Sequence, residues 1–400
     1  MKLIKRENYL KILIDTIETP DIKVITGIRR CGKSKLLEAF IEYLSKNDPS
    51  ANIIYINLNL TDYEDLTEYH ALNNYINSHY QKNKTNYLFI DEIQMCEGFE
   101  KAIISLHTSE KYSIYITGSN AFLLSSDLAT LFTGRTFQIE VYPFSFAEFC
   151  QYFEPSNIQK AFDDYIFIGG MAGTYPYKTE KSRISYLNEV YKTLILRDIV
   201  QKYKIRKPIL IEKISDFMMD NISNITSARN IAKTISNTEL QANNATISSY
   251  LKYLCNAFAF YKIRKYDVKG KKYLTFHDKY YLCDHAFRYS LLGTRNMDFG
   301  RVIENIIAIE LIRRGYTIYA GFLYGKEIDF VALKHSQKLY IQVSENISYQ
   351  ETLKRELTPL KEIKDAYPKI LLSRTLQPTY DIDGIQIIDI ANWLRTTDSI

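Results

Sequence analysis

The chain has 400 residues, of which 46% are hydrophobic and 24% are charged, and its formal net charge is +5. These proportions exclude a disordered or fibrous chain, and at roughly 150 residues per domain the length predicts two to four domains. The mild positive charge permits contact with nucleic acid without arguing for it.

Two features that the sequence lacks bear on the cellular location of the protein. No apolar run is long enough to span a bilayer, and the start of the chain turns polar before a signal-like core develops. We therefore expect a cytoplasmic protein without membrane contact. The five cysteines are scattered and include no C-x-x-C pair, which disfavours a disulfide framework and a structural zinc site.

The first 150 residues alternate strand-length apolar runs with segments of helical period. The runs, rich in β-branched or aromatic residues, lie at 22–26, 52–58, 87–90, 113–117 and 136–141. Helical stripes occupy 33–44 and 66–80. Such alternation predicts an α/β fold with a parallel sheet covered by helices on both faces, and we place this first domain at 1–150.

Residues 27–34, Gly-Ile-Arg-Arg-Cys-Gly-Lys-Ser, lie between a predicted strand and a predicted helix, the context that supports a phosphate-binding loop. The two glycines permit a tight loop whose N–H groups point at phosphate oxygens. Lys33 would reach the β- and γ-phosphates of ATP, and the Ser34 hydroxyl would ligate Mg²⁺. The predicted nucleotide contacts are Gly27, Ile28, Arg29, Arg30, Cys31, Gly32, Lys33, Ser34 and Lys35.

Residues 87–92 form an apolar strand that ends in two carboxylates. Asp91 would hold Mg²⁺ through water, and Glu92 would be the base that polarises the attacking water. An acidic pair at a strand end is more often solvated surface. Downstream of a phosphate-binding loop, in a series of strands and helices, it predicts ATP hydrolysis.

Two further elements of the first domain have open interpretations. Ser119 or Asn120, after the strand 113–117, could hydrogen-bond the γ-phosphate or the lytic water, or could cap a helix that begins near Ala121. Arg135 could reach a γ-phosphate in cis or from a neighbouring subunit of a homo-oligomer, or could be a solvated loop arginine.

The middle of the chain changes pattern twice. Residues 151–205 are mostly helical and predict a helical extension, or lid, beside the sheet. Within 206–290, helices near 209–219, 228–235 and 246–258 precede strands at 260–266 and 272–277, which predicts a winged helix. Basic residues that could contact DNA phosphates on the hairpin are Arg264, Lys265, Lys271 and Lys272. Winged helices in ATPases also serve as protein–protein modules, so both functions stay open.

The last segment, 291–400, has the pattern of a second, separate α/β domain. Its expected helices lie at 302–314 and 352–365 and near the end of the chain, and its expected strands lie at 317–320, 327–332, 338–343 and 369–373.

Five motifs together resemble a group of prokaryotic AAA-superfamily ATPases. They are the loop 27–34, Phe-Ile-Asp-Glu-Ile-Gln at 89–94, Ile-Thr-Gly-Ser-Asn at 116–120, Gly-Arg at 134–135, and Tyr-Pro-Phe-Ser-Phe-Ala-Glu-Phe at 142–149. Segments 168–171 and 196–199 also resemble recurring segments of the group. The resemblance implies an AAA-type P-loop fold, ATP binding and hydrolysis, and a C-terminal domain of unknown function with a restriction-endonuclease-like fold.

The C-terminal segment matches that endonuclease-like pattern only in part. Glu304 and Asp329 match the metal-holding carboxylates, whereas Gln342 and Ser344 stand where an acid and the water-orienting lysine are expected. Lys338 or Lys354 could substitute for that lysine. This pattern favours an inactive, nuclease-like scaffold, and it leaves two alternatives to an ATPase: a nucleotide-gated regulatory protein with little turnover, or an ATP-regulated nuclease.

Overall fold

The computed structural model describes residues 3–118, 132, 134–236, 242–270, 272–293 and 298–396, with the backbone alone at 196–197, 236 and 272–277. The chain divides into two compact units. The first consists of Met1–Tyr142, Arg197–Lys204 and Asn256–Phe258, and the second of Pro143–Leu196, Ile205–Cys255 and Ala259–Ile400.

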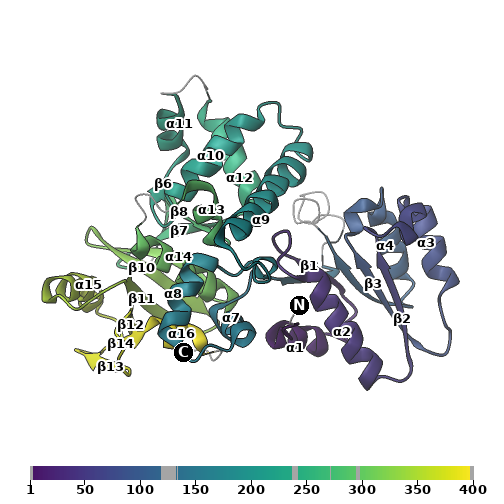
Figure 1. Cartoon of the computed structure of the whole chain (residues 1–400), viewed down its shortest axis with the longest axis horizontal. Helices are drawn as coiled ribbons and strands as arrows, with labels where there is room; N and C mark the ends of the chain where they lie inside the picture. Colours follow the sequence, from purple (N-terminus) through teal and green to yellow (C-terminus); the bar gives the residue numbers. More distant parts are fainter. Residues whose placement is uncertain are drawn as a thin grey trace. The chain divides into compact units, whose positions relative to one another are not determined.

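The first unit contains a sheet of five parallel strands in the order β2-β3-β4-β1-β5 (Figure 1). The strands are β1 (Ile22–Thr26), β2 (Ala51–Asn57), β3 (Thr85–Asp91), β4 (Ser113–Thr117) and β5 (Thr136–Glu140). The predicted parallel sheet is therefore confirmed. Because β4 pairs in parallel with both β3 and β1, the carboxyl ends of these three strands are neighbours at one edge of the sheet.

Helices cover both faces of this sheet, because side chains alternate between the faces along each strand. Its described helices are α1 (Glu7–Asp15), α2 (Lys33–Asn47), α3 (Tyr69–Ser78) and α4 (Phe99–Thr108). On one face, Ile90 and Ile116 belong to a hydrophobic core shared with α3 and α4. On the other face, Phe89 and Tyr115 contact Phe40 of α2, with ring centroids 5.9 and 5.2 Å away.

The helix expected at 66–80 is observed as α3 (Tyr69–Ser78), and it begins three residues later than expected. Leu66 is instead the last residue of a 3-10 helix, η1 (Thr61–Leu66). The Glu68 side chain accepts a hydrogen bond from the His70 N–H at 2.8 Å and so caps α3, which explains where α3 begins.

The second unit is built on a nine-stranded sheet in the order β13-β14-β12-β11-β10-β9-β7-β8-β6. The strands are β6 (Ile225–Thr226), β7 (Phe260–Asp267), β8 (Lys272–Leu282), β9 (Thr317–Leu323), β10 (Lys326–Lys334), β11 (Gln337–Ser344), β12 (Lys369–Ser373), β13 (Tyr380–Ile382) and β14 (Ile385–Asp389). The sequence pattern missed β13 and β14, which are short.

The helices after the first sheet, as far as the structure describes them, begin with α7. They are α7 (Phe146–Phe153), α8 (Ile158–Ile168), α9 (Glu180–Thr193), α10 (Pro208–Asp220), α11 (Ala228–Ser236), α12 (Asn244–Asn256), α13 (Ala286–Leu292), α14 (Phe299–Arg313), α15 (Gln350–Glu362) and α16 (Ile390–Arg395). A π-helical segment, η4 (Leu194–Gln201), follows α9. None of the helices in the described ranges combines the length and apolar character needed to cross a bilayer.

The hairpin β7–β8 does not stand apart from the C-terminal strands. β7 pairs with β9 in parallel, with Lys265 opposite Ala320, so strands from the ranges 206–290 and 291–400 share one sheet. The sequence pattern instead predicts a separate C-terminal α/β unit. Pairing between strands so distant in sequence leaves no trace in local hydrophobic periodicity, and the division of the chain into four domains stays a prediction.

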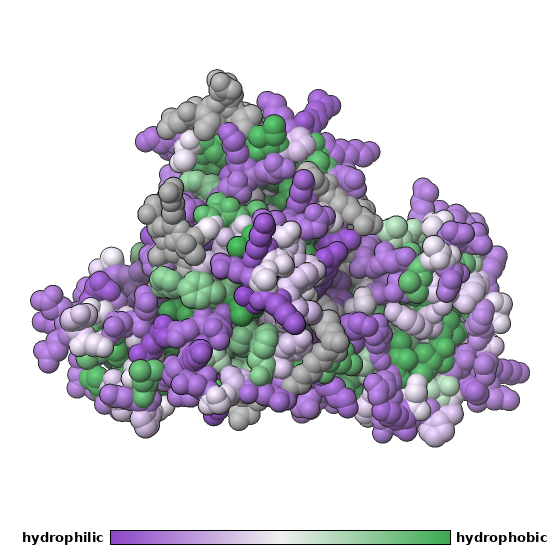
Figure 2. Space-filling model, viewed as in Figure 1, coloured by the Kyte–Doolittle hydropathy of each residue, from purple (hydrophilic) through white to green (hydrophobic). Residues whose placement is uncertain are grey.

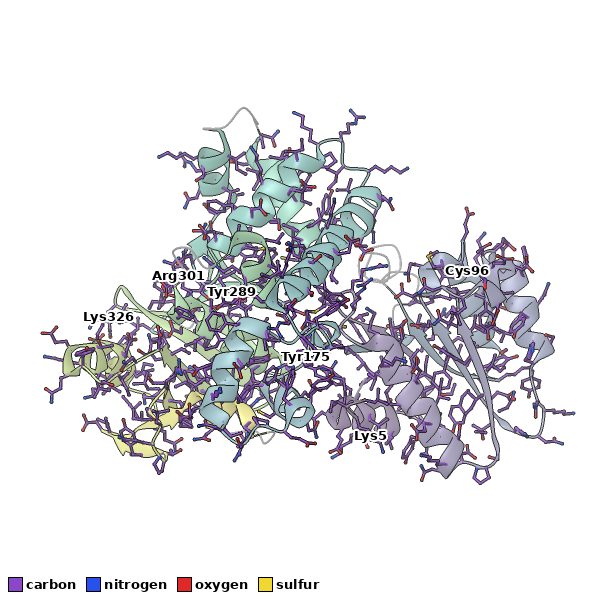
Figure 3. All side chains as sticks on the ribbon, in the orientation of Figure 1. Lys5, Cys96, Tyr175, Tyr289, Arg301 and Lys326 are labelled. Atoms are coloured by element: carbon purple, nitrogen blue, oxygen red, sulfur yellow. The ribbon has the colours of Figure 1, made fainter. Side chains whose placement is uncertain are left out.

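Aromatic residues pack the start of the second unit. Tyr175, labelled in Figure 3, lies against Phe144, Phe149 and Phe153, with ring centroids 5.9, 5.6 and 5.0 Å away. Ser145 begins α7 with a capping box, in which its hydroxyl accepts from the Glu148 N–H.

On the visible surface, hydrophilic residues predominate and hydrophobic ones form small groups (Figure 2).

Candidate nucleotide site

The phosphate-binding loop 27–34 follows β1 and its last residues begin α2. Gly27 has a φ of +139°, and a Cβ atom there would lie 2.1 Å from the Val141 carbonyl oxygen. Gly32 has a φ of +104° and precedes the first residue of α2. Both conformations favour glycine, and at Gly27 the close backbone excludes any side chain.

Residues of α1 and the segment before it support the loop. The Arg6 Nη1 donates a hydrogen bond to the Cys31 carbonyl at 3.1 Å, and the guanidinium lies 4.5 Å from the centroid of the Tyr9 ring. Burial raises the pKa of the Cys31 thiol, so Cys31 is a packed, protonated part of the loop. Arg6 could not be recognised from local sequence patterns, because its contact with the loop spans 25 residues.

The Lys33 side chain is 5% exposed and lies inside the loop. Its ammonium donates hydrogen bonds to the carbonyl oxygens of Gly27, at 3.1 Å, and Ile28, at 3.2 Å. Phosphate oxygens bound by the loop would compete for the same ammonium. The neighbouring Lys35 is exposed and pairs with Glu38 at 2.5 Å, so its side chain is engaged along α2.

The acidic pair lies at the carboxyl end of β3. Asp91 is 1% exposed, and its Oδ1 accepts a hydrogen bond from the hydroxyl of Thr117, the last residue of β4. The same hydroxyl oxygen accepts from the Glu92 N–H at 3.1 Å. The Thr117 hydroxyl therefore forms hydrogen bonds with both residues of the acidic pair.

A polar residue after β4 was expected at Ser119 or Asn120, which both lie outside the described residues. Thr117 was not singled out by the sequence analysis. One feature of the sequence could have indicated Thr117. It carries a hydroxyl group and is the last residue of the predicted strand that follows the acidic pair.

The residues at this edge fit Mg²⁺. Asp91 Oδ2 is buried and has no hydrogen-bond partner among the described residues, while the Ser34 hydroxyl is close enough to favour the ionised carboxylate. Burial raises the pKa of Asp91, and the hydroxyls of Thr117 and Ser34 oppose this shift. A carboxylate and a hydroxyl are oxygen ligands of the kind that Mg²⁺ prefers.

Glu92 is held in an unusual backbone conformation, with φ 59° and ψ 47°. A residue other than glycine adopts this left-handed region only where its surroundings impose it, often at functional sites. The Gln94 Nε2 donates to Glu92 Oε2 at 2.5 Å and orients the carboxylate. Gln94 is the third residue, after Arg6 and Thr117, whose contact was not predicted from the sequence.

Arg135 is exposed and lies just before β5. Its carbonyl accepts from the N–H of Ile22, the first residue of β1, whereas the phosphate-binding loop follows the last residue of β1. The five residues of β1 span about 13 Å, so Arg135 lies at the opposite edge of the sheet. This placement does not suit a contact between Arg135 and a γ-phosphate bound by the same chain. A contact with a γ-phosphate bound by a neighbouring subunit stays a prediction.

A cluster of charged side chains from β8, β10 and α14 lies in the second unit. The Lys279 ammonium contacts Glu304, at 2.8 Å, and Glu327, and the Tyr281 hydroxyl donates to Glu304 at 2.7 Å. Lys279 is 3% exposed, and although burial disfavours its charge, the carboxylates of Glu304, Asp329 and Glu327 raise its pKa. Burial and the charge of Glu304 raise the pKa of Asp329 well above its usual value.

Of the two departures from the endonuclease-like pattern, Gln342 contacts this cluster, whereas the Ser344 hydroxyl donates to the Asn346 carbonyl at 3.3 Å. Gln342 accepts from the Asp329 N–H at 3.3 Å and donates to Glu356 at 2.9 Å, so its amide joins β10 to α15. Neither proposed substitute for the missing lysine is brought to the cluster. Lys338 lies 3.5 Å from Asp365, and Lys354 is exposed on α15. Lys279, which the sequence analysis missed, takes a place among the carboxylates instead.

The hairpin residues proposed to contact DNA differ in their surroundings. Arg264 is exposed on β7. The Lys265 ammonium lies 4.3 Å from the centroid of the Phe322 ring, and burial lowers its pKa. Lys271 lies outside the described residues, and only the backbone of Lys272 is described.

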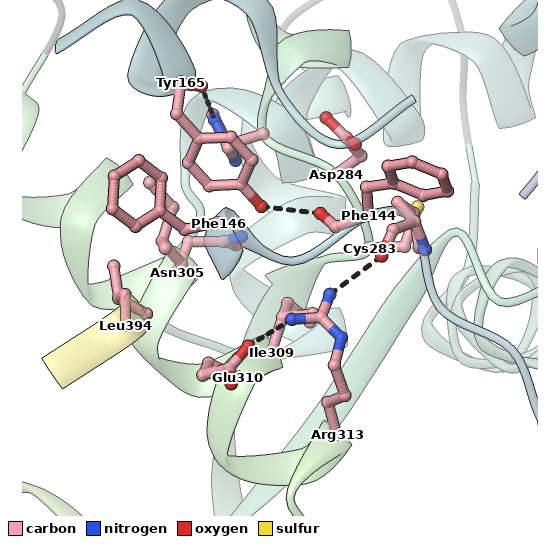
Figure 4. Close-up of a pocket in the computed structure, with 13 residues that line it drawn as sticks. Phe144, Phe146, Tyr165, Cys283, Asp284, Asn305, Ile309, Glu310, Arg313 and Leu394 are labelled. Atoms are coloured by element: carbon pink, nitrogen blue, oxygen red, sulfur yellow. Dashed lines mark hydrogen bonds and ion pairs between the residues drawn. The ribbon is translucent and has the colours of Figure 1, made fainter. Parts of the chain in front are cut away.

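A small polar pocket of the second unit contains none of the predicted site residues (Figure 4). Asp284 accepts hydrogen bonds from the Gly170 N–H at 2.7 Å and the Ala286 N–H at 2.9 Å. A Cβ atom at Gly169 would lie 2.3 Å from Asp284, and one at Gly170 would lie 2.2 Å from the Phe144 carbonyl. The Gly-Gly pair at 169–170 is therefore explained by packing.

Comparison with known proteins adds four matches. A family model described as an AAA domain matches residues 19–150, and one described as a domain of unknown function matches residues 159–298. An uncharacterised protein of Haemophilus influenzae is 36% identical over 398 residues, which cover 98% of this chain and 98% of that protein. An uncharacterised protein of Methanocaldococcus jannaschii is 28% identical over 410 residues, covering 97% and 88% respectively.

One solved structure, the Walker-type ATPase PABY2304 of Pyrococcus abyssi, resembles this chain with a TM-score of 0.52 and 15% sequence identity. The match covers 73% of this chain and 96% of that one. At this identity the likeness concerns the fold alone.

Proposed function

This chain belongs to the same family as its Haemophilus influenzae relative and carries an AAA-type ATPase domain, and from this premise we propose that it binds ATP with Mg²⁺ and hydrolyses it. One observation carries the proposal. The phosphate-binding loop, Thr117 and the pair Asp91–Glu92 end three adjacent strands at one edge of a parallel sheet. Ligands bind at this edge in open α/β sheets.

Each residue of this edge has a proposed task in an in-line attack of water on the γ-phosphorus. N–H groups of the loop hold the phosphates, and the Lys33 ammonium offsets their charge. Bound Mg²⁺ would supply a Lewis acid for the phosphate oxygens, held by the Ser34 hydroxyl and, through water, by Asp91. Glu92 orients the attacking water and accepts its proton, and ADP and inorganic phosphate leave.

Two variants separate binding from turnover. We expect Lys33→Ala to lose ATP binding in a calorimetric titration. Glu92→Gln should bind ATP but release no phosphate, since an amide is a poor proton acceptor. Glu97→Gln, which changes an exposed carboxylate nearby, is the matched control. Hydrolysis by Glu92→Gln at the parent rate would show that Glu92 does not have this task.

A second candidate is a nucleotide-gated regulatory protein with little turnover. It is favoured by the hydrogen bond from Gln94 to Glu92, because this bond occupies a carboxylate oxygen that would otherwise be available to the attacking water. Steady-state phosphate release by the parent, measured against Gln94→Leu, distinguishes the candidates. A slow parent and a faster variant would support the regulatory protein.

We also propose that α10 to β8 form a winged helix that contacts DNA or another protein. The supporting observation is the element order, helix, short strand, two helices and hairpin. Filter binding of duplex DNA over a salt series tests DNA contact, with Arg264→Gln as the variant. No affinity even at low salt would leave protein contact as the function of these elements.

Metal-dependent DNA cleavage is not part of this proposal. The Lys279 ammonium contacts Glu304, one of the two carboxylates that a metal would need, and Gln342 and Ser344 supply neither an acid nor a lysine. Incubation with plasmid DNA and Mg²⁺ or Mn²⁺, beside Asp329→Ala, should give no cutting by either protein. Cutting by the parent alone would restore the nuclease alternative.

The cytoplasmic location and the assembly of a homo-oligomer are also proposals. Glu92→Gln with ATP bound should be larger than the nucleotide-free protein in light scattering if Arg135 acts from a neighbouring subunit. An unchanged mass would show that Arg135 does not contact the γ-phosphate of a neighbouring subunit.

A further inference from the structure

An ion pair ties the phosphate-binding loop to a part of the chain far away in sequence. Arg29 Nη1 lies 3.3 Å from Asp198 Oδ1, across a separation of 169 residues. The Asp198 side chain is 6% exposed and that of Arg29 is 24% exposed. Because a buried carboxylate without its cation is costly, the pair constrains both the loop and the segment that carries Asp198.

The segment that carries Asp198 is unusual in two respects. It lies in η4, a π-helix, a conformation that is rare and is concentrated at functional sites. In addition, Arg197–Lys204 packs with the first unit, although the chain on both sides of this segment belongs to the second.

A second short segment of the same kind meets the first. Asn256–Phe258 also packs with the first unit between stretches of the second. The Asn256 Nδ2 donates to the Tyr203 hydroxyl at 3.1 Å. The segment 197–204 is therefore held at one end by Arg29 and at the other by Asn256.

On the side of the loop, phosphate binding must disturb the surroundings of Arg29. The Lys33 ammonium is bonded to the carbonyls of Gly27 and Ile28, the two residues before Arg29. Phosphate oxygens would draw that ammonium away from these carbonyls. Their negative charge would also attract the guanidinium that now faces Asp198.

We propose that the Arg29–Asp198 ion pair couples nucleotide binding in the loop 27–34 to the conformation of the segment 197–204. The inference rests on the proposed function only in requiring that the loop bind nucleotide. Asp198 is here a positioning residue and touches no substrate. Coupling between two sites is reciprocal. If bound nucleotide changes the conformational equilibrium of the segment, then a variant that loosens the segment must change the nucleotide affinity.

Hydrogen–deuterium exchange of peptides from 197–204, with and without ATPγS and Mg²⁺, measures this coupling. In the parent we expect the nucleotide to change their exchange about fivefold or more, the lower end of common allosteric coupling. In Asp198→Asn the change should fall below about twofold. The same is expected in Arg29→Gln, which alters a predicted nucleotide contact and is therefore compared at ATPγS concentrations that saturate the variant in a calorimetric titration. Asp198→Glu should restore most of it, and Glu38→Gln, which breaks an exposed pair on α2, should leave it intact.

The outcomes separate this inference from the proposed function. If ATPγS binds but the segment responds equally in the parent and in Asp198→Asn, or does not respond in the parent, the coupling is wrong. If the parent shows no ATPγS binding in a calorimetric titration, the proposed function itself fails. Should Asp198→Asn melt at a much lower temperature, Arg29→Gln decides, because Arg29 is the more exposed partner.

Discussion

The Thr117 hydroxyl donates a hydrogen bond to Asp91, and the two residues end the adjacent parallel strands β4 and β3. The same oxygen accepts the Glu92 N–H at 3.1 Å. One hydroxyl thus orients the carboxylate proposed to hold Mg²⁺ and anchors the backbone of the residue proposed to activate water.

Thr117→Val should therefore lower ATP turnover more than ATP binding. Loss of a group that orients a metal ligand costs about 10- to 100-fold in activity or metal affinity. We expect a loss of kcat in this range, with an ATP dissociation constant within about threefold of the parent value. Thr117→Ser keeps the hydroxyl and should stay near the parent rate. Equal rates for the valine and serine variants would show that this hydroxyl has no effect on turnover.

Gly27→Ala should prevent the loop from closing on phosphate. The new Cβ would lie 2.1 Å from the Val141 carbonyl, so the loop or β5 must move. Overpacking of about 1–3 kcal/mol corresponds to a loss of nucleotide affinity of about 5- to 150-fold. Gly384→Ala, at a positive φ with no atom within 4 Å of the new Cβ, should leave calorimetric ATP binding unchanged.

Lys23 should make the stability of the first unit depend on pH. It is 0% exposed, lies 5.3 Å from the Tyr115 ring centroid, and donates to the Thr19 carbonyl. Burial lowers the pKa of Lys23 from 10.5 to about 8. Between these values the unfolded chain binds more protons than the folded chain. The contribution of Lys23 to the free energy of unfolding therefore rises with pH, by at most about 1.4 kcal/mol per unit, and is lost as the pH falls through 8.

Lys23→Met removes this titration. Its stability relative to the parent should fall as the pH rises from 7.5 to 9.5, in urea unfolding followed by hydrogen exchange of peptides from β1 and β4. Leu13→Ala, an equally buried but non-titrating site, is the control for general destabilisation. A difference between Lys23→Met and the parent that is the same at all pH values would contradict the lowered pKa.

Lys279→Met should strongly destabilise the second unit. It leaves Glu304 and Glu327 without their shared cation, and breaking a buried pair costs about 3–5 kcal/mol. Fluorescence of Trp393, the chain's single tryptophan, reports urea unfolding of this unit. Lys262→Met breaks an exposed pair with Asp278 and should cost less than about 1 kcal/mol. Adding Glu304→Gln to Lys279→Met should recover part of the loss, and equal costs for the two lysine variants would show that the cluster is not a buried ion pair.

Local sequence patterns predicted much of the nucleotide site. The loop 27–34, the strands at Ile22–Thr26 and Ser113–Thr117, and the start of α2 follow from consecutive residues whose backbone needs and periodicity are local. The AAA-type domain implied by the family resemblance is confirmed by the family model at residues 19–150. Ser119 and Asn120, by contrast, stay predictions.

Contacts between strands that are distant in sequence could not be predicted from those local patterns. Hydrophobic periodicity indicates which face of a strand is buried but not which strand lies beside it. The neighbours of Asp91 and the cation among Glu304 and Glu327 depend on that choice, and the partner of Arg29 depends on where η4 packs. For this reason Thr117, Asp198 and Lys279 could not be recognised from their own sequence neighbourhoods.

The amino-acid sequence by itself determined that this protein has a phosphate-binding loop followed by an acidic pair, because each motif is a short run of residues with its own backbone requirements. Only the tertiary structure decided what these motifs meet. The insertion of β1 between β4 and β5 and the pairing of β7 with β9 bring residues together across long stretches of chain. Burial then gives their charges and hydrogen bonds an energetic weight that they lack in the unfolded chain.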